Sequence, residues 1–259
     1  MSVPTVVGTR SPGTGPALLL GPSLGTSTAL WGPAAALLTG HFDAIAWDLP
    51  GHGGSPATRE PFSVSDLADA VVRLADDASV PEFYYAGVSL GGHVGLELAL
   101  RHPSRLLGLA IICSAAKFGD AAAWTARAAT VRAQGTPVLI DGAAKRWFSE
   151  GFIARQSARS SGMLHDLSDT DDESYALCCD ALATSDIRSS LGDITTPTLA
   201  VYGENDPVVG ADEAEFVAEG VQHGAALRIH DASHLAAIER PEVVAGALID
   251  FFGKGAGHD

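Results

Sequence analysis

The sequence predicts an α/β protein in which helices flank a mainly parallel, twisted sheet. Short apolar runs rich in strand-forming residues alternate with segments whose apolar residues recur at helical spacing. The 259 residues are 46% hydrophobic, which is enough to bury one sizeable core. The expected strands span residues 3–7, 17–20, 44–47, 83–88, 106–113, 197–202 and 226–230.

Helical spacing is clearest in three segments between and after these strands. Residues 63–78 keep their apolar side chains on one face. Residues 92–101 directly follow a strand, and residues 241–252 close the chain. This alternation of strands and helices is what favours a parallel sheet.

The alternation stops between residues 117 and 185. This stretch is mostly Ala-rich helical sequence with few strand-like runs, and the strand rhythm resumes at Pro197. We interpret the stretch as a helical cap placed over one edge of the sheet. The predicted organisation is therefore a core of residues 1–116 and 186–259, with a cap of residues 117–185.

The composition disfavours several classes of partner. The formal net charge of −15 argues against nucleic acid and anionic membrane surfaces. No apolar run is long enough to span a bilayer, and the first residues lack the basic and apolar segments of a signal peptide. Three cysteines do not make a disulfide framework, so we expect a cytoplasmic protein. The sequence does not specify whether the chain forms a homo-oligomer.

The strongest motif is G-x-S-x-G at residues 87–91, directly after an expected strand and directly before an expected helix. In this context the motif is typical of a nucleophilic serine. Gly87 and Gly91 permit a tight turn that lifts the hydroxyl of Ser89 out of the sheet, because a Cβ at either position would clash. We therefore predict that Ser89 is the nucleophile.

A serine hydroxyl needs a base to take its proton, and His234 is the best candidate among the nine histidines. His234 follows the last expected strand, so it belongs at the carboxyl edge of the sheet, where catalytic groups collect. Its position also agrees with the chain order of serine, acid and histidine that the motif implies. His52, in a turn before the nucleophile, and His93, in the helix after it, fit this role less well.

The acid that orients the imidazole is predicted to be Asp206. This residue follows the expected strand at residues 197–202, on the same edge of the sheet. Glu204 and Asp231 are neighbouring alternatives, which we interpret as a solvated turn residue and a residue that stabilises its own loop.

An acyl-transfer site also needs donors for the oxyanion. The backbone N–H of Leu90, directly after the nucleophile, is one candidate, and that of Leu24, in the turn after residues 17–20, is the other. These amides and the triad supply the nucleophile, the base and the electrostatics, so we expect no metal and no organic cofactor. The glycine-rich segments lack complete dinucleotide- and phosphate-binding patterns, and the cysteines lack the ligand cluster of a zinc site.

Together these motifs resemble those of the α/β-hydrolase superfamily across nearly the whole chain, and in particular those of 3-oxoadipate enol-lactone hydrolases. The resemblance implies a helical cap inserted after the sixth strand. It is carried by residues 23–26 (SLGT) with 30–31 (LW), 47–55 (WDLPGHGGS), 87–92 (GVSLGG), the cap segments 114–117 (SAAK), 124–127 (WTAR), 146–148 (RWF), 178–181 (CCDA) and 186–188 (DIR), and the tail 234–241 (HLAAIERP).

The resemblance further implies a serine hydrolase that opens a small, carboxylate-bearing enol-lactone to 3-oxoadipate during the breakdown of aromatic compounds. The carboxylate of such a substrate needs a cationic or amide partner. Arg127, close to Trp124, and Arg146, next to Trp147, are the candidates in the cap. Trp124 is nominated as a further substrate-binding residue, and Trp147 is expected to line the pocket.

Alternatives of two kinds are left by these observations. A carboxylesterase, a cofactor-free perhydrolase and a hydrolase of carbon–carbon bonds would use the same fold. A non-catalytic protein that binds a small molecule belongs to a different class, and a complete triad argues against it. Epoxide hydrolases and haloalkane dehalogenases are disfavoured, because they place an aspartate where this chain has Ser89.

Overall fold

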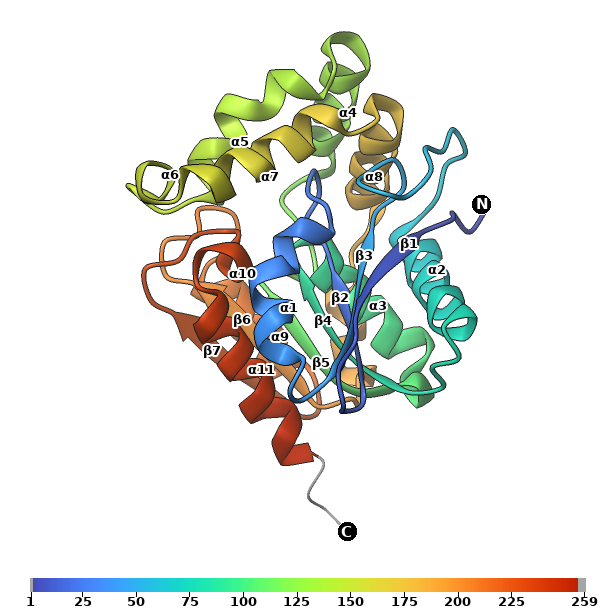
Figure 1. The fold of residues 1–259 in the computed structure, drawn as a ribbon. Coiled ribbons are helices and arrows are strands. Elements are labelled where there is room, and N and C mark those ends of the chain that lie inside the picture. Colours follow the sequence, from blue (N-terminus) through green and yellow to red (C-terminus); the bar gives the residue numbers. More distant parts are fainter. Residues whose placement is uncertain (1, 256–259) are drawn as a thin grey trace.

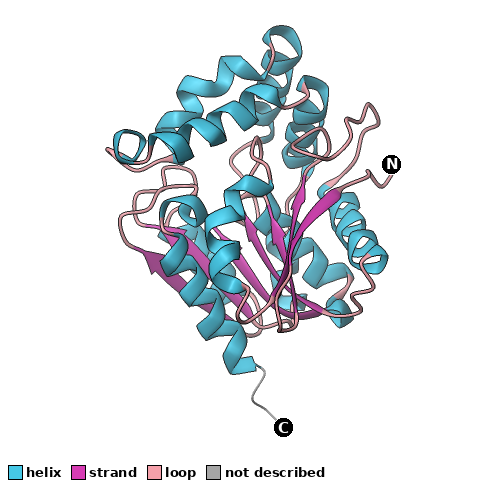
Figure 2. Ribbon diagram, viewed as in Figure 1, coloured by secondary structure: helices cyan, strands magenta, loops and turns pink. Residues whose placement is uncertain are grey.

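A seven-stranded sheet forms the centre of the computed structural model, which describes residues 2–255 (Figures 1 and 2). The strand order is β1-β3-β2-β4-β5-β6-β7, in which β1 runs antiparallel to β3 and all other neighbours pair in parallel. The predicted α/β fold with a mainly parallel sheet is thus confirmed. The strands are β1 (Val7–Ser11), β2 (Ala17–Gly21), β3 (Asp43–Asp48), β4 (Phe83–Val88), β5 (Leu106–Ile112), β6 (Thr198–Gly203) and β7 (Gly224–Ile229).

The first strand does not lie where the sequence predicted it. We expected it at residues 3–7, but β1 begins at Val7 and pairs with β3 over its whole length. It is an edge strand, and none of its residues is fully buried, so its position depends on pairing with β3 and not on an apolar run of its own. The last strand differs less, since β7 begins at Gly224 and not at residue 226.

Helices cover both faces of the sheet, and two consecutive tyrosines of β4 show which helix lies on which face. Tyr84 stacks against Phe252 of α11 (Pro241–Gly255), with ring centroids 4.6 Å apart. Tyr85 lies against Gly95 of α3 (Leu90–Arg101). Neighbouring residues of a strand point to opposite faces, so α11 and α3 lie on opposite sides. The other core helices are α1 (Gly32–Leu38), α2 (Val64–Asp77), α9 (Ala211–Gly220) and α10 (Ala236–Glu239), with short 3-10 helices at Thr28–Trp31, Pro103–Arg105 and Arg188–Asp193.

A layer of helices lies over one end of the sheet (Figure 1). It comprises α4 (Ala121–Gln134), the 3-10 helix Thr136–Leu139, α5 (Ile140–Trp147), α6 (Phe152–Arg155), α7 (Ser157–Asp169) and α8 (Asp172–Thr184). The layer follows β5, and only four strands precede β5, so the expected insertion after a sixth strand is wrong by count. We propose that this layer is the predicted cap of residues 117–185, and we call it the cap below.

Candidate active site

Ser89 stands in a strained turn between β4 and α3. Its backbone angles are φ 54° and ψ −118°, a conformation that residues other than glycine rarely adopt. Glycine is required on both sides of the turn. A Cβ on Gly87 would lie 2.3 Å from the backbone of Gly91, and one on Gly91 would lie 2.5 Å from the carbonyl oxygen of Pro22. The turn therefore presents the serine hydroxyl at the end of the strand, as the motif predicts.

Ser89, His234 and Asp206 form one hydrogen-bonded chain. Nε2 of His234 lies 2.9 Å from Oγ of Ser89, and Nδ1 lies 2.9 Å from Oδ2 of Asp206. The three residues follow the carboxyl ends of β4, β7 and β6, which bring them to one edge of the sheet. The side chains of His234 and Asp206 are buried, at 5% and 0% exposed. The imidazole thus donates Nδ1–H to the carboxylate and keeps Nε2 free to accept the serine proton.

The two alternative acids do not reach His234. Glu204 lies instead beside Arg228 and His230. Asp231 has a side chain that is 78% exposed and pairs with Arg240. Among the candidates, only Asp206 is placed to orient the imidazole.

The turn at residues 23–26 leaves one amide free beside Ser89. Ser23 N–H donates to Oγ1 of Thr26, Gly25 N–H donates to Nε2 of His52, and Thr26 N–H donates to the carbonyl oxygen of Ser23. Within the described chain, the N–H of Leu24 donates to no protein acceptor, and the N–H of Leu90 does not either. These are the two donors that the sequence nominated for an oxyanion.

A cavity of about 90 Å³ lies between these groups and the cap. On the core side it is lined by Ser23, Leu24, Ser89, Val208 and His234, and on the cap side by Phe118, Trp124, Arg127, Leu139, Ala143, Arg146, Trp147, Leu167, Tyr175 and Leu182. All four cap residues nominated from the sequence, Trp124, Arg127, Arg146 and Trp147, are therefore in its wall.

Two arginines in the cavity wall lack a carboxylate partner. Among residues 2–255, no Asp or Glu oxygen lies within 4.0 Å of the guanidinium nitrogens of Arg127 or Arg146. Arg127 lies over the ring of Trp124, 4.7 Å from its centroid. Burial lowers the pKa of Arg146, and the positive charge of Arg127 lowers it further. In a chain with a net charge of −15, this uncompensated pair is a ready site for an anion.

Sequence reasoning missed the residue that joins the cap to the loop of His234. Glu239 is 7% exposed. Its carboxylate accepts from the N–H and hydroxyl of Ser149, at 2.8 and 2.6 Å, and from the N–H of Ser233, at 2.6 Å. Leu235 N–H also donates to the carbonyl oxygen of Trp147. No local motif predicts that Glu239 joins the two segments, because Ser149 lies 90 positions away from it in the sequence.

The described residues hold neither a metal cluster nor a membrane-spanning helix. Among residues 2–255, no group of three or more His, Cys, Asp and Glu side chains is arranged to hold a metal ion. Within the same range, no helix combines the length and the apolar character needed to cross a bilayer.

Comparison with known proteins identifies the family. Residues 16–241 match the family model described as the alpha/beta hydrolase fold. The chain is 36% identical over 227 residues to 3-oxoadipate enol-lactonase 2 of Acinetobacter baylyi, which covers 88% of this chain and 85% of that protein. It is 28% identical to a putative carbamate hydrolase, RutD, of Variovorax paradoxus, covering 95% of this chain and 94% of that protein.

The solved structures agree. The enol-lactonase from Burkholderia xenovorans LB400 superposes with a TM-score of 0.92 at 29% identity, covering 96% of both chains. The protein belongs to the α/β-hydrolase family and is a hydrolase. Within that family, the predicted resemblance to 3-oxoadipate enol-lactonases is confirmed.

Proposed function

We propose that the protein hydrolyses carboxylic ester or lactone bonds, and that its substrate is 3-oxoadipate enol-lactone, which it opens to 3-oxoadipate. The observation that carries this proposal is the uncompensated pair Arg127 and Arg146 in the same cavity as Ser89. A lactone that bears a free carboxylate can place its carbonyl at the serine and its charge at the arginines. The similarity to 3-oxoadipate enol-lactonases of Acinetobacter baylyi supports the same substrate.

The proposed reaction begins with the attack of Ser89 Oγ on the lactone carbonyl carbon while Nε2 of His234 takes the hydroxyl proton. The N–H groups of Leu24 and Leu90 hold the resulting oxyanion. When the tetrahedral intermediate collapses, the ring C–O bond breaks and His234 returns the proton to the leaving enol oxygen. The product of this half-reaction is a single acyl-enzyme whose acyl chain carries the freed enol, which tautomerises to the ketone.

The second half-reaction releases the acid. His234 takes a proton from a water molecule, whose oxygen attacks the ester carbonyl of acylated Ser89. Collapse of the second intermediate breaks the bond to Oγ, and His234 returns the proton to the serine. Throughout, Asp206 stabilises the imidazolium and fixes its tautomer. All bonds made and broken are covered by these residues and one water, so the proposal includes no metal and no cofactor.

The proposed partner is accordingly a small anionic molecule, and the proposed compartment is the cytoplasm. Cys113, Cys178 and Cys179 are all buried and unpaired, which suits a reducing environment.

A spectrophotometric screen of the purified protein tests this function. The enol-lactone should be hydrolysed with a higher kcat/KM than any member of a panel of neutral phenyl and alkyl esters, because only the lactone engages the arginine pair. Efficient turnover of the neutral esters together with no turnover of the lactone would reject the substrate and leave a general esterase.

A further inference from the structure

His52 is a buried histidine whose protonation pattern is fixed by its surroundings. It is 1% exposed, and Nδ1 lies 2.9 Å from the carbonyl oxygen of Pro50. A carbonyl oxygen only accepts hydrogen bonds, so Nδ1 carries the proton. Nε2 is then an acceptor, and it receives the N–H of Gly25 at 3.1 Å. The ring therefore connects the segment around residue 50 to the turn at residues 23–26.

The backbone angle of Gly25 and its close neighbours restrict its conformation in addition to this hydrogen bond. Its φ of +85° lies in the left-handed region, which favours glycine. A Cβ at this position would lie 2.7 Å from Leu167 and 3.3 Å from Tyr175, both in the cavity wall. The peptide that follows Leu24 is thus held between the cap and His52. The direction of the Leu24 N–H depends on how that turn is held.

The cap also fixes His52 itself. The ring stacks on Tyr175 of α8, with centroids 6.1 Å apart and planes inclined by 21°. The chain on either side of His52 is tied to the start of α8 by hydrogen bonds. Asp171 N–H donates to the carbonyl oxygen of Gly51, and Thr58 N–H donates to Oγ of Ser174.

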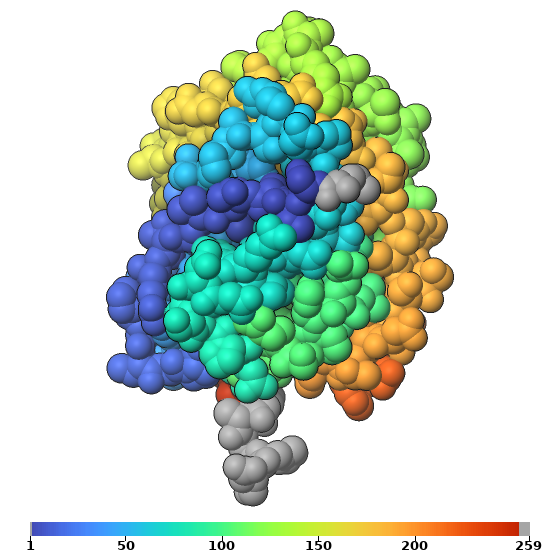
Figure 3. Space-filling model, turned by 90° about the vertical axis from the view of Figure 1, so that its right-hand side faces the viewer, coloured from blue at the N-terminus to red at the C-terminus, as the bar shows by residue number. Residues whose placement is uncertain are grey.

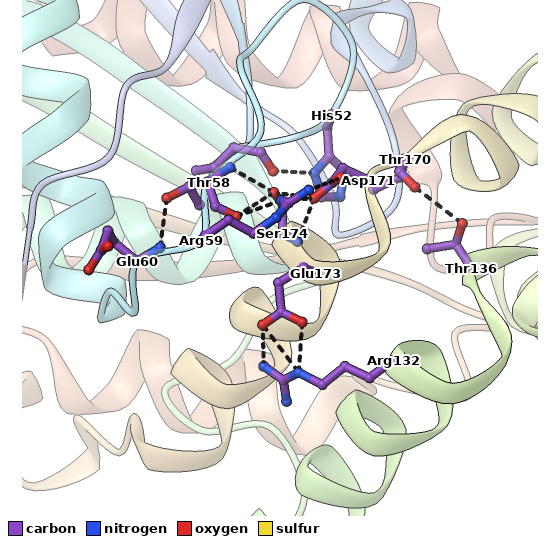
Figure 4. A network of polar contacts seen from close by, with 11 residues as sticks. His52, Thr58, Arg59, Glu60, Arg132, Thr136, Thr170, Asp171, Glu173 and Ser174 are labelled. Atoms are coloured by element: carbon purple, nitrogen blue, oxygen red, sulfur yellow. Dashed lines mark hydrogen bonds and ion pairs between the residues drawn. The ribbon is translucent and has the colours of Figure 1, made fainter.

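Charged groups reinforce this connection at the surface. Arg59 makes two hydrogen bonds to the carboxylate of Asp171, and Figure 4 shows this pair beside His52, Thr58 and Ser174. The same carboxylate caps α8 by accepting from Ser174 N–H. In the space-filling view of Figure 3, the cyan segment of the core, which follows residue 50, lies against the cap. His52 is therefore held by contacts on several sides.

We infer that His52 is a positioning residue for the oxyanion site. It sets the orientation of the Leu24 N–H by accepting the hydrogen bond from the N–H of Gly25. The inference rests on the proposed function, because it needs Leu24 to bind the oxyanion. His52 does not line the substrate cavity, so it acts through its neighbours, which are the turn at residues 23–26 and the ring of Tyr175. Through its stacking on Tyr175, it also makes the geometry of the turn depend on the position of α8.

Two variants separate the two nitrogens. His52→Asn keeps a donor near the Nδ1 position for Pro50 but removes the acceptor for Gly25. His52→Gln places an amide oxygen near the Nε2 position and keeps that acceptor. His93→Asn is a matched control, because His93 is 0% exposed and also uses Nδ1 on a carbonyl oxygen and Nε2 on another group, Oγ of Ser185. None of its hydrogen bonds in the described chain reaches the turn at residues 23–26.

The measurement is kcat and KM on the enol-lactone and on a neutral nitrophenyl ester, with active sites counted from the acylation burst. Loss of one oxyanion donor costs about 100- to 1000-fold in kcat, so a misdirected donor should cost about 10- to 100-fold. We expect His52→Asn to lose this much in kcat on both substrates with little change in KM, and His52→Gln and His93→Asn to stay within about threefold of the unaltered protein.

An unaltered kcat in His52→Asn, or an equal loss in His52→Gln, would overturn the inference. Ser89→Ala in the same assay keeps the proposed function separate, since activity retained there rejects the serine mechanism itself. If His52→Asn does not fold, the ¹⁵N spectrum of the histidines in the unaltered protein at neutral pH decides. A bare Nε2 with a protonated Nδ1 at His52 supports the inference, and a protonated Nε2 refutes it.

Discussion

The two walls of the active-site cavity are built in different ways. On the core side, Ser89, His234 and the free amides of Leu24 and Leu90 are held by strand ends and tight turns, and their positions follow from backbone geometry. On the cap side, Arg127, Trp147 and their neighbours project from separate helices, and side-chain packing sets their positions. The contrast suggests that the core wall performs the reaction and the cap wall selects the substrate, so variants in the two walls should have separable effects.

The largest effect is expected at the nucleophile in the core wall. Removing a triad serine costs about a million-fold in turnover, so Ser89→Ala should be inactive on lactones and neutral esters alike. Because its side chain only loses an oxygen, the fold should persist, which circular dichroism can check. Activity above about a tenth of the unaltered protein would show that another residue attacks the substrate.

The next effect concerns the acid. Asp206→Asn should lower kcat by about ten-thousand-fold, because an amide no longer favours the imidazole tautomer that accepts the serine proton. Asp231→Asn is the matched control, and its effect should be mild since that carboxylate is 78% exposed and pairs with Arg240. A reversed order of the two losses in a steady-state assay would move the acid to Asp231.

Variants in the cap wall should distinguish substrates. A hydrogen bond to a charged group contributes about 1.5–3 kcal/mol, which is roughly ten- to a hundred-fold in kcat/KM. Arg127→Ala and Arg146→Ala should therefore lower kcat/KM on the enol-lactone by about that factor and spare a neutral phenyl ester. Equal losses on both substrates would mean that the arginines only hold the cap together.

Below the cavity, His52 should make stability depend on pH. Burial lowers the pKa of His52 to about 4, while Asp171 and the Pro50 carbonyl oppose this shift. The unfolded chain therefore binds the proton first as pH falls, so the stabilisation is present above about pH 6.5 and is lost towards pH 4. Between about pH 7.5 and 5 the loss is on the order of 2 kcal/mol. Urea unfolding at both pH values should show this dependence, and His52→Gln should reduce it; identical pH dependence in the variant would assign it to other groups.

The smallest effect is expected from metal removal. No step of the proposed reaction uses a metal, so dialysis against EDTA should leave kcat/KM unchanged on both substrates. A reproducible loss that one added metal restores would reveal a step that the triad and the amides do not account for.

The sequence predicted the parallel sheet from local order along the chain. It nominated Ser89 from a five-residue motif, and Asp206 and His234 from their places after strands, because parallel strands bring their carboxyl ends to one edge. The structure brings these three side chains within hydrogen-bonding distance of one another. The first strand was misplaced because an exposed edge strand carries no apolar run to mark it.

What the sequence did not predict depends on contacts between distant segments. The bond from Gly25 to His52 joins residues 27 positions apart, and the bonds from Glu239 to Ser149 join residues 90 positions apart. Neither His52 nor Glu239 lies in a sequence pattern that specifies its hydrogen-bond partner. The two arginines were nominated from their residue type and the family resemblance, but only the structure places them in one cavity without carboxylate partners.

The central claim is that one cavity holds both a serine nucleophile, Ser89, and an arginine pair, Arg127 and Arg146, that binds the carboxylate of the substrate. The most direct measurement compares kcat/KM of the unaltered protein on 3-oxoadipate enol-lactone and on the methyl ester of its free carboxylate, which is neutral but keeps the same lactone ring. The account predicts that esterification lowers kcat/KM for ring opening by about ten-fold or more, since it removes the charge that the arginine pair would bind. Equal or faster ring opening of the methyl ester would contradict it.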